Sequence, residues 1–226
     1  MALADHPTLH PVNWLRDIRA HVPRKAARDW WNRVVYGPDA PRSDECVYVD
    51  PNAIAQHAAA PRPRRRRRHS GMVLGGDWDR QIAPVGADRK YVSCRMHFVD
   101  GVAWEDTPLF EKLLREIEGG HSPDGCATRA DLVHRYETLD RLFDETRARG
   151  RLLAKSELPD YFRREHGGVF VHIARDGTAL RAGGGAHRLA IARILELPEM
   201  PAQIGVVHPL AIANGALARL RRSRFG

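Results

Sequence analysis

The residues whose types and spacing could do chemistry gather in one segment, "LRAGGGAHRLAIARILELP", at residues 180–198. Three consecutive glycines are followed, after Ala186, by His187, Arg188 and an apolar helical pattern. The first N–H groups of a helix lack intrahelical partners and carry the positive end of its dipole, and preceding glycines let an oxyanion approach them closely. Arg188 adds a forked donor suited to phosphate, and His187 adds a donor that can carry charge near neutral pH. The segment predicts a phosphate or nucleotide site at Gly183, Gly184, Gly185, His187 and Arg188.

A plainer interpretation of the same residues stays open. The glycines can serve a tight turn that packs closely on the helix, with His187 as a satisfied structural histidine and Arg188 as a solvated residue of the first turn. The spacing matches neither the P-loop nor the dinucleotide-binding fingerprint. If the turn holds a phosphate, we expect Arg188 to be mostly solvated in the protein without ligand, so that Arg188→Ala costs little stability there. The plainer interpretation predicts that Arg188→Ala removes an internal contact and destabilises the protein, and that no nucleotide shifts its melting.

The elements around this segment follow from local signals. Residues 169–181 carry β-branched and apolar residues on both sides of Asp176-Gly177, which predicts a β-hairpin with a type I′ turn. A helix over residues 187–196 is expected to begin within two residues of Ala186. Residues 200–208 are expected to form a final strand, so the order is hairpin, glycines, helix, strand.

Further helices and strands are predicted on either side. Thr107 and Thr128 are the expected N-cap residues of two amphipathic helices, the second of which ends at Gly150. The other expected elements are a helical stretch over 11–36 that Pro23 interrupts, short strands over 45–51 and 72–74, a helix over 155–165 capped by Ser156, and a basic amphipathic helix over 209–224.

Carboxylates and cysteines outside the glycine segment carry weaker signals. Asp77 and Asp79 flank Trp78 in "GGDWD", a pattern compatible with a metal site, but a surface turn with Trp78 packed beneath it is the favoured interpretation. The cysteines are odd in number and lie outside any CxxC pattern, which predicts buried or idle thiols rather than a disulfide framework or a zinc site. They are Cys46, Cys94 and Cys126.

Two arginine-rich segments account for the basic charge. The chain has 226 residues and a net charge of +8, and ten arginines lie in "RPRRRRR" (62–68) and in the tail "RLRRSR" (219–224). The rest of the chain is therefore close to neutral. Residues 58–71 have almost nothing to bury, which predicts a linker that does not fold by itself. The two runs offer an alternative function, nucleic-acid binding with the fold as scaffold. The expected contacts in the first run are Arg64, Arg65, Arg66, Arg67 and Arg68.

No long apolar segment is present. None of the apolar runs approaches the roughly 20 residues that span a bilayer. The first residues lack the basic region and the apolar region of a secretory signal. We therefore expect a cytoplasmic protein without a membrane partner.

The segment "GGGAHRLAIARILELPEMPAQIGVV" resembles the signature of the ParB/sulfiredoxin-like superfamily. That signature is a Gly-x-His-Arg or Gly-x-Arg-Arg turn, an apolar helix with alanines, a short loop and a strand. The hairpin segment "VHIARDG" fits the same layout, and the resemblance covers about residues 150–208, roughly a quarter of the chain. Residues 97–150, with "DGVAWEDTPLF", resemble a subgroup of uncharacterised ParB-like proteins.

The resemblance implies nucleotide binding. Known members repair overoxidised peroxiredoxins with ATP, phosphorylate free serine with an adenine nucleotide, or bind CTP and DNA in chromosome partitioning. They share a nucleotide phosphate held by the Gly-x-x-Arg turn. Carried over to this sequence, the resemblance implies Gly184, Gly185, His187 and Arg188 as phosphate contacts, with ATP, ADP or CTP as the nucleotide.

The chain departs from each member at an informative position. Sulfiredoxins have a catalytic cysteine directly before the His-Arg pair, where this chain has Ala186. The serine kinases have an aspartate before the glycine of the turn, where this chain has Gly184, so a base would come from elsewhere. Partitioning proteins continue into a helix-turn-helix domain, for which residues 209–226 are too short. Candidate bases in this chain are Glu157, Asp176 and Asp77.

These observations predict an α/β (α+β) protein with a ParB/sulfiredoxin-like domain. The expected organisation is an N-terminal helical extension (1–57), an Arg/Pro-rich linker (58–71) and the domain itself (72–226, core 150–208). The leading function is phosphoryl transfer or nucleotide hydrolysis with Mg²⁺, because such reactions depend mainly on positioning and charge neutralisation. Nucleic-acid binding without catalysis is the alternative, and binding of a phosphorylated metabolite without chemistry is a third possibility.

Overall fold

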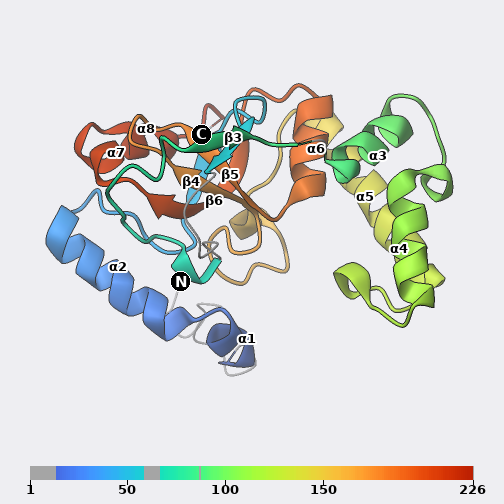
Figure 1. Cartoon of the computed structure of the whole chain (residues 1–226), viewed down its shortest axis with the longest axis horizontal. Coiled ribbons are helices and arrows are strands. Elements are labelled where there is room, and N and C mark those ends of the chain that lie inside the picture. Colours follow the sequence, from blue (N-terminus) through green and yellow to red (C-terminus); the bar gives the residue numbers. More distant parts are fainter. Residues whose placement is uncertain (1–13, 59–66, 87, 226) are drawn as a thin grey trace. The chain divides into compact units, whose positions relative to one another are not determined.

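A computed structural model describes residues 14–58, 67–86 and 88–225 (Figure 1). The chain divides into two compact units. Unit 1 is built from residues 1–85, 153–185 and 198–226, and unit 2 from residues 86–152 and 186–197. Helices and a mixed sheet are both present, which confirms the α+β class. In the described part of the chain, no helix has the length and apolar character needed to cross a membrane.

Unit 1 is organised around a four-stranded sheet with the strand order β1-β6-β4-β5. Strand β6 (Met200–Val207) is fully buried and lies between β1 (Cys46–Val49), to which it is antiparallel, and β4 (Val169–Ile173), to which it is parallel. Strand β5 (Ala179–Gly183) pairs with β4 as an antiparallel hairpin. The predicted hairpin and final strand are thus confirmed, and they lie side by side in one sheet.

The hairpin turn differs from the predicted type. The carbonyl of Ala174 accepts a bond from the N–H of Gly177 (3.0 Å), and the Ala174 N–H donates to Thr178 O (2.9 Å). Gly177 has φ +95°, but Asp176 is not in the positive-φ region that a type I′ turn requires of both central residues. The pattern is that of a three-residue loop, a type I turn followed by a glycine bulge. Asp176 instead caps the turn, because its Oδ1 accepts from the Thr178 N–H (2.9 Å).

Unit 1 also contains a second sheet and several helical elements. Strands β2 (Gln56–Ala58) and β3 (Ile82–Pro84) form a second, two-stranded sheet. The helical elements are α1 (Trp14–Arg19), α2 (Val22–Tyr36), α7 (Pro209–Ala213), α8 (Ala216–Leu220) and the single 3₁₀ turns η4 (Arg67–His69) and η7 (Lys155–Glu157).

Several predicted elements of unit 1 are shorter or divided. The stretch over 11–36 breaks at His21, which has φ +57°, and the helix over 209–224 breaks at Gly215, which has φ +70°. The helix over 155–165 shrinks to one 3₁₀ turn because Pro159 follows directly and disfavours helical backbone before it. The strand over 72–74 is reduced to one bridge between Val73 and Val207.

Unit 2 is helical. It consists of α3 (Arg89–Phe98), α4 (Pro108–Glu118), α5 (Arg129–Arg149), α6 (Ala186–Ile194) and the 3₁₀ turns η5 (Trp104–Asp106) and η6 (Pro123–Gly125). The predicted caps are confirmed. Thr107 accepts from the N–H of Phe110, Thr128 forms a capping box with Asp131, and Gly150 closes α5 at φ +70°. Its core is formed by buried side chains of α3, α4, α5 and α6.

The compact units do not follow the three segments expected from the sequence. Strand β1, within the expected N-terminal extension, is an edge strand of the main sheet. The end of the expected linker is packed on that sheet, because the Gly71 N–H donates to Gly205 O (2.8 Å) and the Ser70 hydroxyl donates to Ile204 O. Residues 59–66 of the linker lie outside the described residues.

Candidate functional site

The glycine run leaves β5 in a backbone conformation that other residues rarely adopt. Gly183, Gly184 and Gly185 have φ values of +119°, +62° and +57°. Glycine enters this region without the steric cost of a Cβ atom. Helix α6 starts at Ala186, as predicted. Gly185 ends the segment 153–185 of unit 1, and Ala186 begins the segment 186–197 of unit 2.

The surroundings of the three glycines differ. A Cβ atom on Gly185 would lie 2.8 Å from the backbone nitrogen of Val169, so close packing against β4 requires a glycine there. A Cβ atom on Gly184 would overlap the guanidinium of Arg67 and lie 3.3 Å from Gly168 O. At Gly183 such an atom would meet nothing within 4 Å. Packing therefore explains the second and third glycines, and the first faces open space in the described structure.

Arg67 brings a cation to the glycine run. From the sequence, this arginine was expected to lie in a solvated linker. Its Nη2 donates to Gly168 O (2.7 Å), its Nη1 donates to Gln203 Oε1, and its Cζ lies 5.5 Å from the centre of the Phe170 ring. Burial lowers the pKa of Arg67, and the negative charge of Asp44 opposes that effect. An arginine remains charged at any physiological pH. No sequence signal separated Arg67 from the arginines before it.

The other two predicted contacts belong to unit 2, in the first turn of α6. Arg188 is 8% exposed, so the expectation of a solvated side chain was wrong. The cause is that α6 is covered on nearly all sides, since the residues from Arg188 to Ala192 are all buried. Truncating Arg188 would therefore disturb packing as well as any ligand contact.

His187 is held neutral. Burial, together with the charges of Lys90 and Arg135, lowers the pKa of His187 to about 4. The expectation that it carries charge near neutral pH was therefore wrong. Its ring meets the ring of Tyr136 edge-on, with centroids 6.1 Å apart. The His187 Nε2 atom and the Tyr136 hydroxyl are buried without hydrogen-bond partners among the described residues.

Charged side chains gather near His187 in unit 2. The Asp124 Oδ2 atom accepts from Lys90 Nζ (2.9 Å) and from Arg135 Nη2 (3.3 Å). Burial raises the pKa of Asp124, but the hydrogen bond and the charge of Lys90 outweigh it and lower the pKa overall. Asp124 has φ +52°, a left-handed conformation that aspartate tolerates better than most residues. The two cations are thus neutralised within the unit.

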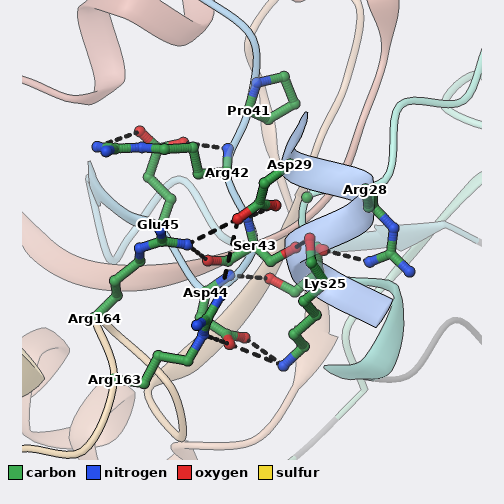
Figure 2. Close-up of polar contacts among 12 residues, drawn as sticks. Lys25, Arg28, Asp29, Pro41, Arg42, Ser43, Asp44, Glu45, Arg163 and Arg164 are labelled. Atoms are coloured by element: carbon green, nitrogen blue, oxygen red, sulfur yellow. Dashed lines mark hydrogen bonds and ion pairs between the residues drawn. The ribbon is translucent and has the colours of Figure 1, made fainter. Parts of the chain in front are cut away.

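The densest polar cluster of unit 1 is centred on Asp44, which sequence reasoning did not single out (Figure 2). This carboxylate is fully buried and accepts from Lys25 Nζ (2.8 Å to each oxygen), Arg163 Nε (3.0 Å) and Gln203 Nε2 (2.6 Å). His166 Nδ1 lies 3.4 Å away. These residues are far apart in the sequence, so no spacing could have revealed the cluster.

The Asp44 cluster is suited to holding the fold rather than to proton transfer. Burial raises the pKa of Asp44, but the hydrogen bond from His166 and the charge of Lys25 outweigh it and hold the pKa well below its usual range. Burial lowers the pKa of Lys25, while Asp44 opposes that shift. Because several donors already use the carboxylate oxygens, Asp44 is poorly placed to act as a base. It connects α2, the chain before β1, the segment before β4, and β6.

The carboxylates considered as bases or metal ligands have structural partners. Asp77 and Asp79 both bind Arg175, with Nη2 at 2.9 Å and 2.7 Å, and Trp78 is buried beneath them. Glu157 accepts from the Ala154 N–H (2.7 Å). In the part of the chain that the structure describes, no three or more His, Cys, Asp or Glu side chains gather where they could hold a metal ion. The surface-turn interpretation of "GGDWD" matches these contacts.

The arginine runs are only partly available to a partner. Arg62 and Arg64 to Arg66 lie outside the described residues, and Arg67 is turned into unit 1. Arg68 is exposed, and its carbonyl accepts from Arg28 (3.0 Å). In the tail, Arg221 binds Glu45 (2.7 Å) and the carbonyl of Ala40 (2.8 Å).

The cysteines match their predicted description. Cys94 and Cys126 are buried and Cys46 is partly buried, and none of the three forms a disulfide among the described residues. Burial raises the pKa of Cys94 to about 12, so its thiol stays protonated and unreactive at neutral pH.

Comparison with known proteins adds no family to these observations. The chain matches no protein-family model, no curated protein and no solved structure.

Proposed function

We propose that the chain is a nucleotide-binding protein of the ParB/sulfiredoxin-like kind, in which the glycine run Gly183–Gly185 holds a phosphate group. One observation carries the proposal: three successive left-handed glycines leave a strand, with open space at the first and a guanidinium against the second. Backbone that can be approached closely, together with a forked cation, suits a phosphate oxyanion.

Arg67 is the cation that we assign to the phosphate. A guanidinium carries five N–H donors, and the bonds to Gly168 O and Gln203 Oε1 use two of them. Those bonds fix the direction of the side chain before a ligand arrives, which reduces the entropy lost on binding. Gln203 is itself held by Asp44 (2.6 Å), so the buried ion cluster acts as the support of the phosphate contact.

The order of elements supports the fold assignment within the proposal. A hairpin, a glycine turn, a helix and a strand follow one another, and the last strand returns parallel to the first strand of the hairpin. In this proposal, Ala186 stands where sulfiredoxins have a catalytic cysteine, which argues against sulfiredoxin chemistry. The chemistry that we propose instead is phosphoryl transfer or nucleotide hydrolysis. Mg²⁺ would be held mainly by the nucleotide phosphates and water, because protein sites for this ion usually supply only one or two carboxylates.

Nucleic-acid binding through Arg64–Arg68 remains the alternative. The internal bonds of Arg67 and Arg221 weigh against it, because each run contributes at least one arginine to unit 1. The described arginines of the two runs that are exposed to such a partner are Arg68, Arg219, Arg222 and Arg224.

The proposal is tested by equilibrium binding and thermal melting with ATP, ADP, CTP and GTP, each with and without Mg²⁺. A ligand at about 100 times its Kd stabilises the folded state by about 2.7 kcal/mol, which is readily measured. Arg67→Lys keeps a charge but loses the fork, so it should weaken binding markedly. Arg68→Lys, one residue further along the same run, is the matched control and should bind like the parent.

Two outcomes would contradict the proposal. One is a parent protein whose melting none of the four nucleotides shifts. The other is equal affinity in Arg67→Lys and Arg68→Lys, with both variants folded as judged by circular dichroism. Retarded migration of DNA or RNA at low salt, with no nucleotide effect, would favour the alternative.

A further inference from the structure

Helix α2 has its polar and apolar sides reversed. Lys25 and Asn32 are its buried residues, and Lys25 reaches Asp44 while Asn32 donates to Pro41 O (2.9 Å) and Gly71 O (2.7 Å). A helix on the surface of a soluble protein normally turns its apolar side to the core. Here polar contacts hold the inner side.

The opposite side of α2 carries large apolar residues. Trp30 is 67% exposed, Trp31 is 58% exposed and Val34 is 61% exposed, and Val35 is exposed beside them. These four residues are called the α2 apolar face below. The two indole rings are tilted by 46°, with centroids 6.5 Å apart, so they do not stack flat on each other. Two adjacent exposed tryptophans are costly to leave in water and mark an interaction surface.

The charge around this face is positive. Arg24 and Arg33 of α2 are exposed. The aspartate of α2, Asp29, is turned inward, where its carboxylate accepts from the Ser43 N–H (2.7 Å) and from Arg164 (3.0 Å). The face therefore offers apolar side chains flanked by guanidinium groups, and it fits a partner that is apolar and anionic.

We propose that the α2 apolar face lies on an anionic lipid surface, as a helix parallel to the membrane plane. Figure 1 shows α2 along the outside of unit 1, so its exposed side can lie against a flat surface. Tryptophan is enriched at the boundary between headgroups and acyl chains, and basic residues beside it attract anionic headgroups. A helix that lies on a membrane needs no membrane-spanning segment, whose absence was the reason for expecting no membrane partner.

Other partners fit the same residues less well. A second copy of the chain would place Arg24 and Arg33 against a face whose own aspartate points inward, so the arginines would gain no partner from α2. Single-stranded nucleic acid would use the indoles and the arginines, because bases stack on aromatic rings beside cations. It would leave Val34 and Val35 without a role, whereas acyl chains would cover them.

The test measures partition of the full chain onto vesicles by sedimentation and by tryptophan emission. One set of vesicles is phosphatidylcholine alone, and the other is an equal mixture of phosphatidylcholine and phosphatidylglycerol. We expect binding to the anionic set, with a blue shift of the emission. Trp30→Ser combined with Trp31→Ser should abolish binding without changing the far-ultraviolet circular dichroism. Leu210→Ser combined with Val99→Ser removes two exposed apolar residues elsewhere and is the matched control.

A charge variant separates the two contributions. Each basic residue near an anionic leaflet contributes about a fivefold change in partition, so Arg24→Gln combined with Arg33→Gln should weaken binding roughly 30-fold. The absence of binding to either vesicle set overturns the proposal. Dimers that the tryptophan variant abolishes, without vesicle binding, overturn it in favour of a second copy. Binding of oligothymidylate without vesicle binding overturns it in favour of nucleic acid.

Discussion

Replacing Lys25 by Met should strongly destabilise unit 1. The substitution keeps most of the side-chain volume but removes the ammonium group that binds both oxygens of Asp44 at 2.8 Å. Removing one partner of a buried ion pair typically costs about 3–5 kcal/mol, because the remaining charge stays buried. Asp44 keeps Arg163 and Gln203, so we expect the low end, about 3 kcal/mol.

The assay is urea unfolding followed by far-ultraviolet circular dichroism at neutral pH. Arg24→Met is the matched control, since Arg24 precedes Lys25 on the same helix but is exposed, and a change there should stay within about 0.5 kcal/mol. Asp44→Asn in the Lys25→Met background completes a double-mutant cycle. Asparagine tolerates the left-handed backbone at position 44, where φ is +59°.

The double-mutant cycle distinguishes a coupled ion pair from two independent contributions to stability. If the ion pair is the cause, the double variant should cost clearly less than the sum of the two single variants, with a coupling of at least about 1 kcal/mol. Additive costs, or a Lys25→Met protein as stable as Arg24→Met, would show that the pair is not coupled. The depressed pKa of Asp44 adds a pH signature. Its stabilisation is present above the ordinary aspartate pKa, near 4, and is lost as the pH falls through the lower folded-state value.

Further predictions concern the glycine run and the first turn of α6. Acidification should destabilise unit 2 as the pH falls from about 6.5 toward 4. The pKa of His187 is lowered to about 4, so the neutral side chain stabilises the fold fully only above the ordinary histidine pKa, near 6.5, and up to about 3 kcal/mol is lost as the pH falls. Melting of His187→Gln as a function of pH should lack this step. Gly185→Ala should lower the melting temperature more than Gly183→Ala, because the new Cβ meets Val169 only at position 185. Equal losses would contradict the packing argument. Arg188→Ala should destabilise the protein without ligand by about 1–3 kcal/mol, since the side chain is buried; denaturant unfolding measures this, and an unchanged midpoint would contradict it.

The sequence predicted most reliably what local chemistry decides. Thr107, Thr128 and Gly150 were identified from residue types that satisfy helix ends, and the structure confirms each of them. The hairpin was found from one Asp-Gly pair, but its turn type was not. The two turns differ in the number of loop residues and in the sign of φ at Asp176, and the aspartate-glycine sequence is compatible with both.

The sequence did not predict the roles of residues whose surroundings are set by contacts with distant parts of the chain. Arg67 is one of several adjacent arginines in the sequence, and only the positions of Gly168 and Gln203 give it a different role. Asp44 and Lys25 meet through tertiary structure alone. The expectations for His187 and Arg188 failed for the same reason, because tertiary packing sets both the burial of Arg188 and the low pKa of His187.

The reversed helix α2 shows how these contacts connect. A buried lysine and a buried asparagine on one side of a helix leave the opposite side for the remaining residues. Trp30, Trp31 and Val34 are large apolar residues of a helix, and such residues usually indicate the side that faces a core. Lys25 decides otherwise, because its bond to Asp44 fixes the rotation of α2 about its axis and turns the tryptophans outward. The ion cluster that supports Arg67 through Gln203 is thus the same cluster that exposes the α2 apolar face, and a loss of Asp44 would affect both surfaces at once.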